Sequence, residues 1–110
     1  MWEADAGEEQ DMIVNLHKRQ DGTVLAAACD SDVLGRKLEE GDRRLDLTGA
    51  FYDGKELDED AAGDVLRNAD HINVVGEKAV ALALKEGLIE QSNVVRVQGI
   101  PHAEAALLHE

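Results

Sequence analysis

The feature that most constrains the fold is a predicted β-hairpin close to the start of the chain. Residues 12–18 alternate between apolar and polar side chains, as a strand with one buried face does. Residues 24–29 (VLAAAC) read as the return strand, and Asp21-Gly22 between the two segments is typical of a tight type I′ turn. The alanines of the return strand leave room for a helix to pack closely against the pair.

Hydrophobic periodicity and capping residues predict the elements that follow the hairpin. They are a short helix over 32–38, a strand over 43–47, a loop over 49–54, a helix capped by Asp58, an extended link over 71–75, a helix over 77–86, a strand over 93–98, a turn over 99–102 and a short helix over 103–110. The clearest helix is 77–86, because it holds an unbroken apolar run and Gly87 suits its C-terminal cap.

These elements predict an α+β fold of two layers. We expect a sheet of about four strands that starts with the β-hairpin, with helices packed on one face and the strand 93–98 beside the hairpin. Residues 12–110 are expected to form a single α+β domain. Residues 1–11 carry five acids and no base, so they predict a disordered acidic extension that is dispensable for folding. Met12 is an alternative start, and Trp2 is the one docking candidate in the extension.

The net charge of the chain constrains the salt concentration at which it folds and the partners that it can bind. Asp and Glu number 24 against 11 Lys and Arg, which makes the formal net charge −13. This balance disfavours a protein that coats DNA, because phosphate neutralisation needs a surplus of basic residues. The acidity is spread over the whole chain, and molar salt screens such self-repulsion. We therefore expect a halophilic protein whose melting temperature rises strongly between low and molar KCl.

The sequence also bears on where the protein works. No apolar run is long enough to span a membrane, and the acidic first residues do not resemble a secretory signal. The single cysteine excludes an internal disulfide and fits a reducing compartment. These features predict a cytoplasmic protein that does not engage membranes.

Few residues are candidates for catalysis. Cys29 has no basic neighbour in the sequence, and Asp30 would oppose its thiolate, so a buried structural role is favoured. His102 follows Pro101, which restrains the backbone and with it the imidazole. The histidines and the cysteine match no metal-ligand spacing, so neither a metal nor a cofactor is expected.

The link over 71–75 leads into the helix predicted over 77–86, and the N-terminus of that helix is a candidate ligand site. Asn73 precedes this point, and Gly76 allows a backbone or a ligand to approach the helix N-terminus closely. The segment lacks the further glycines of a dinucleotide fingerprint and the lysine pattern of a P-loop. Glu77 would also compete with an anion, so close packing is the favoured interpretation.

Two further groups are candidates for binding a partner. Arg43 and Arg44 belong to the only local positive cluster, and Arg96 projects from the last predicted strand. Phe51 and Tyr52 lie together in a predicted surface loop, where large apolar groups usually bury or bind.

Several short motifs resemble those of a small conserved archaeal family, a domain of unknown function. The matching segments are MIVNLHK at 12–18, ACD at 28–30, LG at 34–35, EG at 40–41, FYDG at 51–54, NVVGEKAV at 73–80 and GIPHA at 99–103. The last two are the most specific, because simple strand or helix patterning does not demand their Gly, Glu and Pro-His. The resemblance implies an archaeal cytoplasmic protein and transfers no catalytic residue.

Two functions of different classes fit these residues. We favour a non-enzymatic binding module that docks on RNA or a ribonucleoprotein through His102 and the arginine and aromatic candidates. The alternative is a small enzyme with His102 as acid or base, Glu77 as its partner carboxylate and Cys29 as a distant third. We expect Glu77 and His102 to share one surface at a rim of the sheet. A His102 side chain within hydrogen-bond reach of Glu77, Asn73 or Cys29 in a cleft would favour the enzyme.

Overall fold

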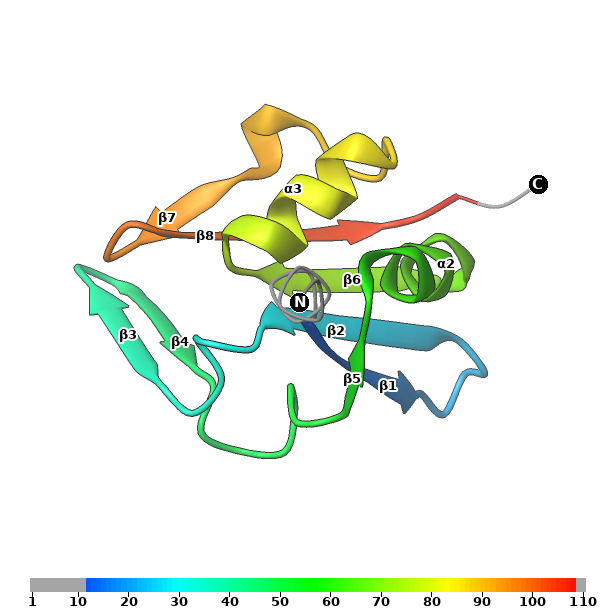
Figure 1. Ribbon diagram of the computed structural model, residues 1–110, viewed down its shortest axis with the longest axis horizontal. Coiled ribbons are helices and arrows are strands. Elements are labelled where there is room, and N and C mark those ends of the chain that lie inside the picture. The colour runs from blue at the N-terminus through cyan, green and yellow to red at the C-terminus, as the bar shows by residue number, and fades with distance from the viewer. Residues whose placement is uncertain (1–11, 109–110) are drawn as a thin grey trace, which may run out of the picture.

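The computed structural model describes residues 12–108, and the extension predicted over 1–11 lies outside them (Figure 1). The elements are β1 (Met12–Lys18), β2 (Val24–Asp30), β3 (Lys37–Glu40), β4 (Arg43–Asp46), β5 (Lys55–Leu57), α2 (Glu59–Asn68), β6 (His71–Val75), α3 (Glu77–Lys85), the 3₁₀ turn η1 (Gln91–Asn93), β7 (Val95–Val97) and β8 (Ile100–Ala106). Six strands form one sheet in the order β5-β1-β2-β6-β8-β7, and β3 pairs with β4 in a second sheet. The α+β class is confirmed, whereas the expectation of about four strands is too low.

The first hairpin forms as predicted, with β1 and β2 paired antiparallel over the full length of both strands. Its turn is not type I′, because Gly22 has a positive φ of 90° and Asp21 does not. The Asp21 carboxylate instead accepts hydrogen bonds from the N–H and the hydroxyl of Thr23, at 3.0 and 2.6 Å. This side-chain contact supports a wider loop in which only one residue needs the left-handed conformation.

The helix expected over 32–38 is wrong. Residues 31–35 form turns, Gly35 has a φ of 89°, and β3 follows immediately. Leu38 is buried and lies opposite Leu45 of β4. The apolar residues in this segment have the spacing of one helical face, but here they lie in a turn and at one buried position of a strand. Gly35 disfavours a helix in the same segment.

The link expected over 71–75 is a central strand of the sheet. β6 pairs parallel with β2 and antiparallel with β8. Strands with neighbours on both sides are often short and mostly apolar, which explains why no alternation marked this segment.

The C-terminal part of the chain also differs from expectation. β7 pairs with β8 at the edge of the sheet and not beside the first hairpin, and a two-residue turn with positive φ at Gln98 (52°) and Gly99 (81°) joins them. β8 runs where a turn and a helix were expected. Pro101 fits this strand because its carbonyl accepts from the N–H of Gly76 at 2.9 Å, beyond the end of β6. The nitrogen of Pro101 points to that same side, where no ladder donor is needed.

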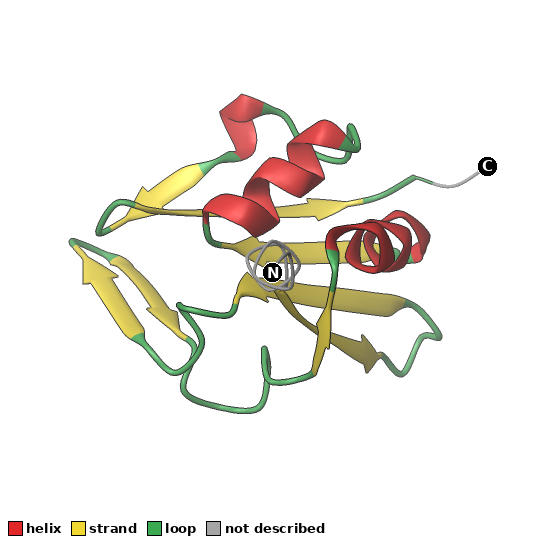
Figure 2. Ribbon diagram, viewed as in Figure 1, coloured by secondary structure: helices red, strands yellow, loops and turns green. Residues whose placement is uncertain are grey.

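Both α-helices pack on one face of the six-stranded sheet (Figure 2). Asp58 caps α2 as predicted, since its carboxylate accepts from the N–H of Ala61 at 2.9 Å. The predicted cap at Gly87 is also confirmed, with a φ of 77° and an N–H that donates to Leu84. No helix among residues 12–108 is long and apolar enough to cross a membrane.

The beginning of α3 is tied to the end of β2. Gly76 has a φ of 112° and precedes the helix without a capping side chain of its own. Asp30 supplies the cap from β2, where its buried carboxylate accepts from the N–H groups of Lys78 and Ala79 at 3.0 and 2.8 Å. Burial raises the pKa of Asp30, while these two hydrogen bonds oppose the rise.

The other face of the sheet is covered over one half only. The β3–β4 sheet and the loop that holds Tyr52 bury Cys29, Val75 and Val97 beneath them. The second half of this face, around Leu25 and His71, is partly exposed. The sheet therefore has one face that the helices bury over most of its area and one face that presents polar side chains to solvent.

Candidate functional site

Strand pairing brings polar side chains together on the uncovered half of the sheet. Asn73 on β6 lies opposite Glu104 on β8, and His71 lies opposite Ala106. A cavity of about 500 Å³ opens above them, and we call it the open-face cavity. Its lining residues are Arg19, Leu25, Phe51, His71, Ile72, Asn73, Glu104, Ala105 and Ala106.

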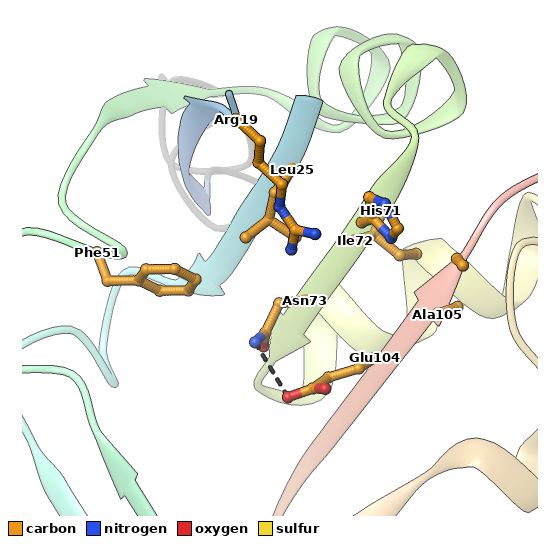
Figure 3. A pocket seen from close by; sticks show the side chains of 9 residues that line it. Arg19, Leu25, Phe51, His71, Ile72, Asn73, Glu104 and Ala105 are labelled. Carbon is orange, nitrogen blue, oxygen red and sulfur yellow. Dashed lines mark hydrogen bonds between the residues drawn. The ribbon is translucent and has the colours of Figure 1, made fainter. Parts of the chain in front are cut away.

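The side chains around the open-face cavity converge on one space (Figure 3). The Phe51 ring reaches in from its loop, and the Arg19 guanidinium descends from the turn that follows β1. Asn73 and Glu104 lie on the floor that β6 and β8 provide. Among residues 12–108, no hydrogen bond or ion pair engages the side chains of Arg19 and His71. Asp21 interacts electrostatically with both, but no hydrogen bond has to break for either side chain to turn toward a ligand.

Phe51 is held in place by the polar face of β1. Asn15 donates its Nδ2 protons to the carbonyls of Ala50 and Phe51, at 2.9 and 3.2 Å. The Nε2 of His17 lies 2.7 Å from the same Phe51 carbonyl, so this nitrogen carries the proton. The two rings stack at a centroid distance of 4.5 Å. Tyr52 also contacts the Phe51 ring in a T-shaped arrangement, at a centroid distance of 4.9 Å. Phe51 is therefore held by two rings and keeps 39% of its surface exposed.

Asn73 is the centre of a hydrogen-bond network beneath the cavity. Its Oδ1 accepts from the hydroxyl of Tyr52 at 2.7 Å and from the Nε2 of His102 at 3.0 Å. Its Nδ2 donates to Glu104 at 3.3 Å. Burial lowers the pKa of His102, an effect that the charge of Glu104 opposes, and burial raises the pKa of Tyr52. Both rings therefore stay neutral near pH 7 and act as donors to Asn73.

The expected pair of Glu77 and His102 does not form. Glu77 lies 3.0 Å from the guanidinium of Arg96, which also donates to the carbonyl of Gly99 at 2.7 Å. Arg96 lies opposite Pro101, so both face the helices, and the next residue, His102, faces the other way. Glu77 and His102 thus lie on opposite faces of the sheet and do not share one surface.

The remaining candidates lie outside the open-face cavity. Cys29 is fully buried, and burial together with Asp30 raises its pKa to about 12, so the thiol stays protonated. Arg43 and Arg44 lie on β4, where Arg44 contacts Glu39 at 3.0 Å. Among residues 12–108, no three side chains of His, Cys, Asp or Glu are grouped as a metal site requires.

The sequence singled out two lining residues of the cavity, Phe51 and Asn73, but not its other three polar ones. Arg19 falls between the two strands predicted for the hairpin, His71 in a predicted link, and Glu104 in a predicted terminal helix. The alternation of β1 did contain a signal, because it placed Asn15 and His17 together on one polar face. The other polar positions become visible only when β6 and β8 are paired.

The comparisons with known proteins agree with this fold. A crystal structure of an uncharacterised conserved protein from Methanopyrus kandleri matches with a TM-score of 0.78 and 30% sequence identity. The match covers 91% of this chain and 94% of that chain. No curated protein matches the chain significantly. The resemblance to an archaeal family is thereby confirmed. The family model described as "Protein of unknown function (DUF424)" matches residues 17–108, so the chain belongs to that family.

Proposed function

We propose that this protein is a non-enzymatic binding module that holds single-stranded RNA in the open-face cavity. The observation that carries the proposal is the convergence of an exposed, positioned Phe51 ring with the unpaired side chains of Arg19 and His71. Unpaired bases bind on sheet surfaces by stacking on aromatic rings, while cations nearby hold the phosphate. The cavity provides one position for each of these contacts.

The acidity of the chain shapes how such binding would work. A net charge of −13 repels RNA at low ionic strength, so long-range attraction does not drive association. In the salt-rich archaeal cytoplasm that we infer for this protein, that repulsion is screened within about 3 Å at molar salt. Short-range stacking and hydrogen bonds survive this screening. We therefore propose that the module recognises bases by contact and holds phosphate only at short range, through Arg19.

The enzymatic alternative has less support. His102 is within hydrogen-bond reach of Asn73, which is one of the contacts that would favour it. However, the His102 side chain is only 18% exposed and does not line the cavity. Its Nε2 proton is committed to Asn73, and Glu77 lies on the other face of the sheet. His102 does have a carboxylate neighbour, since its Nε2 lies 3.5 Å from Oε2 of Glu104, but only Glu104 of this pair lines the cavity.

The proposal is tested by fluorescence anisotropy with a labelled single-stranded RNA of about ten nucleotides, in molar KCl. We expect binding by the natural sequence, and a loss of about tenfold or more in affinity for Phe51→Ala, because one base stack is removed. Leu16→Ala is the matched control, since Leu16 is also an exposed apolar residue and faces the helix side of the sheet. Equal binding by the two variants would contradict the proposal.

A second pair of variants tests the cation. Arg19→Gln and Lys18→Gln remove the same charge from adjacent residues, but only Arg19 lines the open-face cavity. We expect Arg19→Gln to weaken RNA binding several-fold more than Lys18→Gln does. Equal losses would indicate that only the overall charge matters, and the cavity would then not be the binding site.

A further inference from the structure

We infer that the floor of the open-face cavity selects guanine among the four bases, an inference that rests on the proposed function. Asn73 and Glu104 present their polar atoms side by side, 3.3 Å apart, on neighbouring strands. Both line the cavity that the Phe51 ring enters from the side. A base stacked on Phe51 can therefore bring its Watson–Crick edge to these two residues.

The orientation of the Asn73 amide is determined by its neighbours. Oδ1 already accepts from Tyr52 and from His102, so it has no further capacity to serve a ligand. Rotation of the amide by 180° would direct this oxygen at the Glu104 carboxylate, which cannot donate. Asn73 is thus held with its NH₂ group toward Glu104. One N–H of that group binds Glu104, and the second remains as a donor for the cavity.

Glu104 adds only acceptors to this floor. Its side chain is 65% exposed, and both oxygens of a carboxylate are hydrogen-bond acceptors. Oε2 accepts from Asn73 and also lies 3.5 Å from Nε2 of His102, whose proton is donated to Asn73, so Oε1 is the oxygen without a partner and Oε2 keeps capacity for one more donor. Read across the two strands, the floor offers one donor followed by two acceptors.

The edge of guanine is complementary to this order. Guanine presents the acceptor O6, the donor N1–H and the donor N2–H₂ in sequence, so O6 meets Asn73 and the two donors meet the carboxylate of Glu104. Uracil places a second acceptor where N2 lies in guanine, and that oxygen would face the carboxylate. Cytosine and adenine present an acceptor at the ring nitrogen of this edge. Each of these bases leaves at least one repulsive or unpaired contact, which costs affinity.

The inference is tested by titrating the protein with GMP, AMP, CMP and UMP in molar KCl, followed by isothermal titration calorimetry. Mononucleotides separate base preference from the length and structure of an RNA. We expect GMP to bind about tenfold or more tightly than the other three, as for a bidentate contact to one base. Phe51→Ala should weaken all four nucleotides, because stacking does not depend on the polar edge.

Glu104→Gln is the decisive variant. It keeps the shape of the side chain but replaces one acceptor with a donor, so GMP binding should weaken by about tenfold while AMP binding changes little. Glu56→Gln is the control, because Glu56 is an exposed glutamate on β5 that does not line the cavity. Circular dichroism of each variant checks that the fold is intact.

The outcomes separate the inference from the proposed function. Equal affinity for the four nucleotides, with binding that Phe51→Ala weakens, would overturn the guanine preference and leave the RNA-binding proposal in place. A GMP preference that persists in Glu104→Gln would overturn the role of this floor. Absence of binding by every nucleotide and by single-stranded RNA would overturn both.

Discussion

The two faces of the six-stranded sheet are built from alternate residues of the same strands, yet they differ in polarity and in burial. The face under α2 and α3 carries small and branched apolar residues such as Ala28 and Val74, and it is buried except near the end of β1, where Leu16 is 55% exposed. The open face carries Asn73, His71 and Glu104 at corresponding positions. Sheets with antiparallel strands commonly pack one face on the core and leave the other in contact with water. Here one face forms the main core with the helices, and the other presents polar side chains to solvent over the half that β3 and β4 do not cover.

The largest effect is expected at the junction of the packed face. Gly76→Ala would place a Cβ 2.4 Å from the Cγ of Asp30, at a backbone φ of 112°. The carboxylate must then move away from Lys78 and Ala79, so strain and lost hydrogen bonds add to roughly 3–5 kcal/mol of destabilisation. Denaturant unfolding followed by circular dichroism measures this free energy.

Gly22→Ala is the matched control for that variant. Gly22 also has a positive φ, 90°, but an added Cβ meets nothing within 4 Å. Its cost is therefore expected to be backbone strain only, about 1–2 kcal/mol. If both variants lost the same stability, Asp30 would not be the cap that ties β2 to α3.

A smaller effect is expected beneath the open-face cavity. Tyr52→Phe removes the hydroxyl that donates to Asn73 Oδ1, but His102 still donates to the same atom. We expect a loss of about 1 kcal/mol in the free energy of unfolding, because one hydrogen bond is lost and its acceptor keeps a partner. A loss as large as that of Gly76→Ala would mean that the open face carries as much of the stability as the packed face.

The smallest effect is a pH dependence from His102. Burial lowers its pKa below the ordinary value of 6.5, so the unfolded chain binds more protons between the two pKa values. The stabilising contribution of the neutral imidazole is therefore present above pH 6.5 and is lost as the pH falls through this window. His102→Gln keeps an N–H donor and does not titrate, so its unfolding free energy should fall less between pH 7 and 5. Parallel curves would show that the imidazole is not held neutral.

The contrast between the faces also explains which parts of the fold were predictable. The caps at Asp58 and Gly87 are local, because each satisfies backbone groups within a few residues, and both were predicted from sequence. Asp30 caps α3 through hydrogen bonds to residues that are 48 and 49 positions away in the sequence. No local sequence pattern indicates this cap. Capping by a distant strand is a tertiary contact, so it depends on pairing that the sequence does not display.

The candidate site was predictable only in part for the same reason. Phe51 and Tyr52 were predictable candidates because they lie together in a predicted surface loop, where large apolar groups usually bury or bind. Glu104 could not be found, because it joins Asn73 across 31 residues and through the pairing of β6 with β8. Pro101 disfavours a strand at 100–106, because proline has no N–H to donate to a neighbouring strand. In the structure Pro101 lies opposite Gly76, beyond the end of β6, where no such donor is needed.

The central claim, that the open face is the binding face, is tested most directly by nuclear magnetic resonance. Labelled protein is titrated with single-stranded RNA in molar KCl, and the shifts of the backbone amides are mapped. The account predicts shifts at Arg19, Phe51, His71 and Glu104, with the amides of α2 and α3 unchanged. Shifts confined to the helices, or none at saturating RNA, would contradict it.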